Sequence, residues 1–181
     1  MSKSSFKNRI IRAAMLDSYL YEEVEADKSA LGQAMAIVVL SSIAAGIGLY
    51  KTGGFSGIIT GTMASLISWY VWAYLTYFIG TKFLPEQQTK ADLGELLRTI
   101  GYASSPGLFR IFYFIPGIGI LIYLLSSLWM LVAMIIAVRQ ALDYNSTLRA
   151  VGVCVIGYVI QILVLVLIVS IFGGVLPDTP A

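Results

Sequence analysis

The sequence predicts an all-α membrane protein: a polytopic helix bundle with five transmembrane helices and an N-terminal amphipathic surface helix. Composition is the first observation behind this prediction, because 58% of the 181 residues are hydrophobic and 12% are charged. The second observation is that the charges cluster, leaving uncharged runs at 29–50, 52–81, 111–138 and 150–177. Each run exceeds the roughly 20 residues that a helix needs to cross the hydrocarbon core. These runs give four spans, and the distribution of positive charge adds a fifth.

We expect three parts along the chain, namely a headpiece at 1–30, a membrane domain at 31–176 and a tail at 177–181. The predicted spans are 31–50, 57–80, 96–115, 118–138 and 150–174. The first apolar run follows a charged segment and has no small-residue cleavage site. We therefore expect a retained helix there and no signal peptide.

The headpiece carries basic residues first and an acidic block after them. Its apolar residues fall on one stripe at 100° per residue, which predicts a helix on the membrane surface. These residues are Phe6, Ile10, Ala13, Leu20, Tyr21 and Val24. Asp17 lies within the stripe, where an unpaired carboxylate is costly to desolvate. Two interpretations stay open: Asp17 binds a basic group at the mouth of the bundle, or the helix turns so that Asp17 reaches water.

Small residues recur every four positions in the second span, after a short turn predicted at 51–54. They are Gly53, Gly57, Gly61 and Ser65. This spacing lets helices approach closely and predicts a helix-packing surface. The same flat surface could also seat a second copy of the protein.

The third span is the least regular. Only 11 uncharged residues separate Arg98 from Arg110, and Ser104–Gly107 interrupts them. The segment therefore reads as a span, a broken span or a re-entrant hairpin. A helix would place the two arginines about 18 Å apart, so each could reach its nearer interface with its long side chain.

Cytoplasmic loops carry the excess of Lys and Arg, so the loop charges discriminate between topologies. Five spans with the N-terminus inside put ten Lys and Arg inside and two outside, whereas four spans give nine and three. The count favours five spans and a cytoplasmic N-terminus.

In the five-span arrangement most ionisable residues gather at the cytoplasmic face. Our candidate binding residues there are Asp17, Glu22, Glu95, Arg98, Arg139, Asp143 and Arg149. Glu95 with Arg98 and Arg139 with Asp143 have spacings that let each pair meet on one helix face. Two interpretations stay open. Either each pair is a simple ion pair at a helix end, or Asp17 and the acidic block dock on Arg98 and Arg139 and close a cytoplasmic mouth.

The residue inventory argues against an enzyme. The chain has no His and one Cys, Cys154, so we predict no metal site, cofactor or internal disulfide. No serine has an adjacent base, and the only acid–base pair to consider is Glu95 with Asp143, so we predict no catalytic residue. A net charge of +2 is too small to suggest nucleic acid. Expected partners are membrane lipids, with a second copy or other membrane proteins left open.

Several motifs, taken in order along the chain, resemble the Yip domain of the Ypt/Rab-interacting membrane proteins. Gly101, Tyr102 and Pro106 form a Gly-Tyr-x-x-x-Pro pattern after Arg98. The segments 16–25 and 139–143, with Gln33 and Arg149, resemble the short prokaryotic members in particular. The resemblance covers the chain roughly from Ala14 to the last span. It implies five helices, a cytosolic N-terminus and the cell membrane of a prokaryote; eukaryotic members act in vesicle traffic through Rab GTPases and sibling proteins.

These observations predict a non-catalytic membrane scaffold that recruits partners or organises lipid through its charged cytoplasmic face. The alternative is a small permease or channel built from several copies. Its site would lie at the Ser104–Gly107 break, with Gln161 at mid-span in the last helix.

Overall fold

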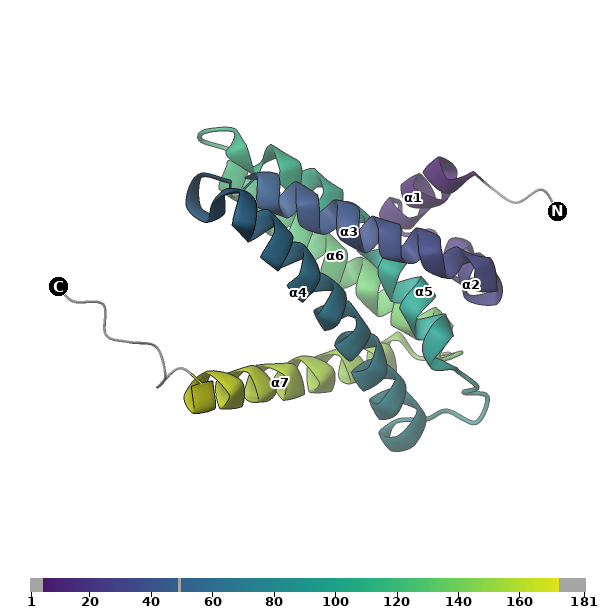
Figure 1. Cartoon of the computed structure of the whole chain (residues 1–181). Coiled ribbons are helices and arrows are strands. Elements are labelled where there is room, and N and C mark those ends of the chain that lie inside the picture. The colour runs from purple at the N-terminus through teal and green to yellow at the C-terminus, as the bar shows by residue number, and fades with distance from the viewer. Residues whose placement is uncertain (1–4, 49, 173–181) are drawn as a thin grey trace.

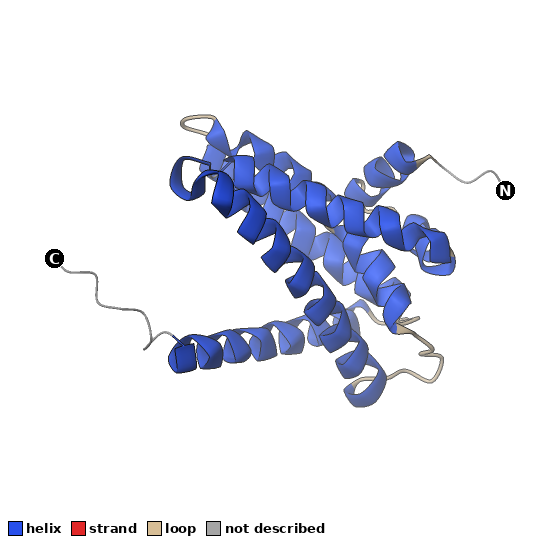
Figure 2. Ribbon diagram, in the orientation of Figure 1, coloured by secondary structure: helices blue, strands red, loops and turns tan. Residues whose placement is uncertain are grey.

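The structure is a computed structural model that describes residues 5–48 and 50–172. Within these residues it contains helices and no strands, which confirms the predicted all-α class (Figure 2). Four helices are long and apolar enough to cross a membrane, as a multi-pass protein requires. They are α3 (Leu31–Gly48), α4 (Tyr50–Phe78), α6 (Gly119–Ala141) and α7 (Thr147–Phe172). The predicted tail at 177–181 lies outside the described residues, as does the end of the last predicted span.

The headpiece forms two helices, so the prediction of one continuous helix is wrong. These are α1 (Phe6–Ala14) and α2 (Ser18–Ala26), and a 3-10 turn, η1 (Lys28–Ala30), leads into α3. The chain breaks at Leu16, whose φ is 62°. Asp17 then begins α2 as its N-cap, because its carboxylate accepts a hydrogen bond from the Tyr19 amide at 3.1 Å. The apolar face of α2 is fully buried against α5 and α6.

The third segment is a broken helix. It consists of α5 (Leu93–Ala103) and a 3-10 helix, η3 (Ser105–Phe114), with Pro106 at the start of the second part. Figure 1 shows it running alongside α6 to the turn at 115–118, so it does not double back as a re-entrant hairpin would. Its two helices have a combined length of about 36 Å. This length is enough for the roughly 30 Å core, and the crossing itself stays a prediction.

Two glycines let α3 pack closely on this broken segment. A Cβ added at Gly101 would lie 2.6 Å from the Cβ of Ala34, and one added at Gly107 would collide with the hydroxyl of Ser41. Real side chains do not approach so closely. The backbone of α5 and η3 is therefore held directly against α3, at the centre of the bundle.

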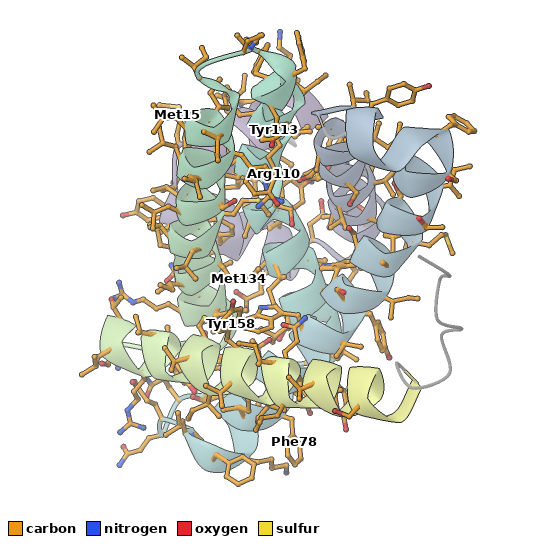
Figure 3. All side chains as sticks on the ribbon, turned by 90° about the vertical axis from the view of Figure 1, so that its left-hand side faces the viewer. Met15, Phe78, Arg110, Tyr113, Met134 and Tyr158 are labelled. Atoms are coloured by element: carbon orange, nitrogen blue, oxygen red, sulfur yellow. The ribbon has the colours of Figure 1, made fainter. Side chains whose placement is uncertain are left out.

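The remaining helices enclose this centre incompletely. The turn predicted at 51–54 is replaced by a kink within α4 at Gly54, whose φ is 59°. After α4 the chain makes a π-helical turn, η2 (Ile79–Phe83). Figures 1 and 3 both show α7 lying across α4 and α6, and not along them. Residues such as Leu163 and Val166 on α7 are consequently exposed.

Candidate functional site

Charged residues gather at one end of the bundle, which we call the ionic end. It is formed by α2, the loop at 84–92, the start of α5 and the turn at 142–146 that follows α6. Almost every side chain that the sequence singled out for binding lies here. Their individual partners, however, differ from those predicted.

Arg9 joins the headpiece to the bundle, and sequence reasoning did not single it out. Its side chain is 2% exposed. Nε donates to Glu23 and Nη2 donates to Asp27, both at 3.0 Å. Nη1 donates at 3.2 Å to Oε1 of Gln33, which also accepts a hydrogen bond from the hydroxyl of Tyr102 at 2.5 Å. One arginine therefore connects α1, α2, α3 and α5.

Asp17 has a local partner. Its carboxylate accepts from Nε of Arg12 at 2.7 Å, and Nη1 of Arg12 donates to Glu23 at 2.6 Å. Asp17 therefore binds a basic group, but the group belongs to the headpiece. The hypothesis that Asp17 docks on Arg98 or Arg139 is wrong.

Arg98 does hold the headpiece, although not through a carboxylate. Its Nε donates at 3.0 Å to the backbone carbonyls of Val24 and Glu25, and its Nη2 also donates to Glu25. These carbonyls end α2 and carry the negative end of its helix dipole. A buried arginine thus caps α2 and fixes it on α5.

The two predicted pairs at helical spacing are absent from the described residues. Glu95 accepts from the Asp92 amide at 2.7 Å in a capping box at the start of α5, and it is not paired with Arg98. Arg139 donates to the carbonyls of Tyr144 and Asn145, at 3.2 and 3.3 Å. The Asp92 amide lies at the start of α5, where amides lack intrahelical partners, and the Tyr144 and Asn145 carbonyls lie in the turn after α6. These backbone groups take the charges in place of the predicted side chains.

Glu86, which the sequence did not single out, anchors α7 with Arg149. Its carboxylate accepts from the amides of Asn145 and Ser146 at 3.0 and 3.3 Å, and it lies 3.5 Å from Nε of Arg149. The Asn145 amide is the main reason that the pKa of Glu86 lies below its usual value. Arg149 also donates to the Pro85 carbonyl at 2.8 Å.

A cavity of about 770 Å³ opens at the ionic end between α2, α5 and α6. Four carboxylates and one guanidinium line it, from Glu22, Glu25, Glu95, Asp143 and Arg139. Burial, followed by the nearby charges of Glu95 and Asp143, raises the pKa of Glu25 to about 8. Glu25 is therefore largely protonated at neutral pH, and the other three carboxylates outnumber the single guanidinium. We call this the acidic cavity.

A second cavity of about 490 Å³, the inner cavity, lies between α3, α4, η3 and α6. Gly57, Gly61 and Ser65 form one wall, and Ser104 and Gln161 also line it. A Cβ added at Gly57 or Gly61 would meet no atom within 4 Å. The described helices therefore do not pack on these glycines as predicted. Gly53 precedes the kink at Gly54, and its predicted packing lies outside the described side chains.

A comparison with known protein families identifies the family to which this fold belongs. A family model of the Yip1 domain matches residues 19–171, from α2 to the last helix. The chain belongs to the Yip1 domain family. No curated protein and no solved structure gave a significant match.

The motif of this Yip1 domain protein has a structural reason. Gly101 permits the contact with α3, and Tyr102 binds Gln33 from the next position. Pro106 lacks an amide donor and begins η3, while the hydroxyl of Ser105 donates to the Tyr102 carbonyl at 2.6 Å. The motif therefore builds the junction between the broken segment and α3.

Metal ligation finds no support at either cavity. Among the residues that the structure describes, no group of three or more His, Cys, Asp and Glu side chains is arranged to hold a metal ion. The acidic cavity can instead attract a positively charged group, because three carboxylates besides the largely protonated Glu25 face one guanidinium that is already bonded to carbonyls.

Proposed function

We propose that this Yip1 domain protein is a non-catalytic membrane scaffold that recruits partners with positively charged groups at its ionic end. The observation that carries the proposal is the acidic cavity, in which four carboxyl groups converge from α2, α5 and the end of α6, and three of them, besides the largely protonated Glu25, offer negative charge. Opposite charge at an interface steers encounter and selects partners. This refines the predicted scaffold, since the charge offered to a partner is negative.

The polar groups of the ionic end already have structural partners, which supports a binding role over catalysis. Arg98 and Arg139 are bonded to backbone carbonyls, and Glu95 caps α5. A general acid or base must be free to exchange a proton with a substrate. Glu95, one half of the only acid–base pair considered, is occupied in its capping box.

The ionic end faces the cytoplasm in this proposal, and the membrane is the cell membrane of a prokaryote. Ten of the twelve Lys and Arg residues lie on that side when five spans are assumed. This imbalance agrees with the positive-inside rule.

A labelled oligolysine peptide tests the proposal with purified protein in neutral-lipid nanodiscs. The double variant Glu22→Gln with Asp143→Asn should bind it about five-fold more weakly, because each exposed charge pair contributes up to about 1 kcal/mol. Asp92→Asn removes a negative charge at an exposed position that does not line the cavity, and asparagine keeps the N-cap of α5, so its affinity should equal that of the wild type. Equal affinity for the wild type and the double variant would contradict the proposal.

Transport by an oligomer is the second candidate, favoured because Ser104 and Gln161 line the same inner cavity. Ser105 does not line it, since its hydroxyl is buried against the Tyr102 carbonyl. Solute flux in proteoliposomes should fall for Ser104→Ala and Gln161→Leu if the cavity is a path. Absence of flux across a broad panel of ions and solutes would remove this candidate.

A further inference from the structure

Arg110 is a cation with an incomplete set of partners inside the membrane domain (Figure 3). Its Nη2 donates to the hydroxyl of Ser127 at 2.9 Å, and its guanidinium carbon lies 4.9 Å from the ring centroid of Tyr123. Its Nε is buried and has no hydrogen-bond partner within the described residues. An arginine that has left water in this way retains a donor to satisfy.

The sequence predicted that the side chain of Arg110 reaches toward its nearer membrane interface. In the structure its guanidinium binds Ser127 of α6 instead. Ser127 lies eight positions after Gly119, where α6 begins. At 1.5 Å per residue this places the contact about 12 Å along α6. The charge is therefore held well within the apolar part of the bundle, and positions of this kind mark functional sites in membrane proteins.

The described chain supplies no counter-ion for this charge. Every Asp and Glu of the described residues lies at 17–27, at 86–95 or at 143, which are all at the ionic end. None of them is among the residues that line the inner cavity. The positive charge of Arg110 in that cavity is therefore complementary to an anion from outside the described residues.

The inner cavity offers room and further donors for such an anion. Ser41 and Ser68 line it together with Arg110, whereas the hydroxyl of Ser42 already donates to the Val38 carbonyl at 2.8 Å. Its glycine wall at Gly57 and Gly61 is open, with no atom within 4 Å of an added Cβ. Hydroxyl and guanidinium donors are the groups that bind phosphate oxygens.

We propose that the inner cavity binds the phosphate of an anionic phospholipid at Arg110, with an acyl chain along the Gly57 and Gly61 wall of α4. A lipid is the occupant that fits because the helices around the cavity expose apolar side chains outward, such as Ile59 and Met63 on α4. A lipid reaches this opening from the bilayer, and its acyl chains supply apolar contacts that offset part of the cost of removing its phosphate from water. An aqueous anion has no such contacts.

Native mass spectrometry of the detergent-purified full chain tests the assignment with phosphatidylglycerol and phosphatidylcholine as probes. The wild type should bind phosphatidylglycerol at least about five-fold more tightly. Arg110→Gln should bring the two affinities together, whereas Lys82→Gln, which removes an exposed charge outside the inner cavity, should keep the preference. Equal binding of both lipids by the wild type, or a preference that survives in Arg110→Gln, overturns the proposal.

A second measurement uses the wild type alone, so it does not depend on the folding of a variant. Photoreactive phosphatidylglycerol should crosslink to peptides that contain 57–65 or 104–110. Crosslinks confined to the ionic end overturn the site. Displacement of the lipid by inorganic phosphate at the same concentration would assign the cavity to free phosphate and overturn the lipid. Neither experiment uses a basic partner, so failure here leaves the scaffold proposal standing.

Discussion

The hydroxyl of Tyr102 lies 2.5 Å from Oε1 of Gln33, and this hydrogen bond ties the third helical segment to the first span. The same oxygen accepts a hydrogen bond from Arg9 at 3.2 Å. Tyr102 of the motif and Arg9 of the headpiece therefore both donate to the side-chain amide oxygen of Gln33. The position of the headpiece depends on this junction, and with it one wall of the acidic cavity.

We expect Arg9→Ala to release the headpiece. The substitution leaves Glu23, Asp27 and Gln33 without their common donor, which should cost on the order of 3 kcal/mol. Tyr102→Phe removes one hydrogen bond and should cost about 1 kcal/mol. Thermal unfolding of the purified protein ranks the variants, and limited proteolysis near Leu16 should speed up most in Arg9→Ala.

Lys7→Ala is the matched control for Arg9→Ala, because Lys7 is exposed on the same helix. It should unfold and be cleaved like the wild type. Equal cleavage of Arg9→Ala and Lys7→Ala would show that Arg9 does not hold the headpiece.

Gly101→Ala and Gly61→Ala should have opposite effects, although both add one methyl group to a helix. At Gly101 the new Cβ meets Ala34 at 2.6 Å, and overpacking of this kind costs about 1 to 3 kcal/mol. At Gly61 it meets nothing, so alanine should be neutral or stabilise by up to about 1 kcal/mol. Melting temperatures of the two variants check this. A destabilised Gly61→Ala would indicate that another molecule packs on that wall.

Glu25 should make the protein less stable as the pH rises. Its pKa is raised in the folded state from 4.5 to about 8, chiefly by burial, so the folded protein binds more protons than the unfolded chain between these values. Its contribution to stability is greatest below pH 4.5 and is lost as the pH rises toward about 8. Melting temperatures at pH 5 and pH 8.5 should therefore differ less in Glu25→Gln than in the wild type.

The five-span topology predicts that residues 87 and 118 face opposite sides of the membrane. In a Cys154→Ala background, a membrane-impermeant maleimide applied to intact cells should label Ile118→Cys and leave Gln87→Cys unlabelled. Both positions are exposed in the structure, so access depends on the side of the membrane. Protection of both positions would place 118 on the inner side and reduce the number of spans to four.

The membrane class, the long apolar helices and the break in the third segment could all be predicted from the sequence. Composition and uncharged length determine whether a segment can cross a bilayer. Pro106 cannot continue the hydrogen-bond ladder of α5. The headpiece was less predictable, because a helical stripe does not show that Asp17 will end one helix and begin another.

The partners of the charged residues were the least predictable part. Spacings of three and four permit Glu95 to meet Arg98 and Arg139 to meet Asp143. A backbone amide at the start of α5 takes Glu95 instead, and carbonyls of the turn after α6 take Arg139. Arg9 looks in the sequence like the other basic residues of the headpiece. Its importance depends on Gln33 and Tyr102, which are distant along the chain.

The sequence by itself determined that this chain is a multi-pass membrane bundle of the Yip1 domain family, because hydropathy and motif order are local properties of the chain. Only the tertiary structure decided which charges meet and which stay unpaired. The acidic cavity and the unpaired Nε of Arg110 exist because distant helices meet there. The glycines of α4 illustrate the same limit, since their spacing does not specify whether a helix, a lipid or a cavity lies opposite them.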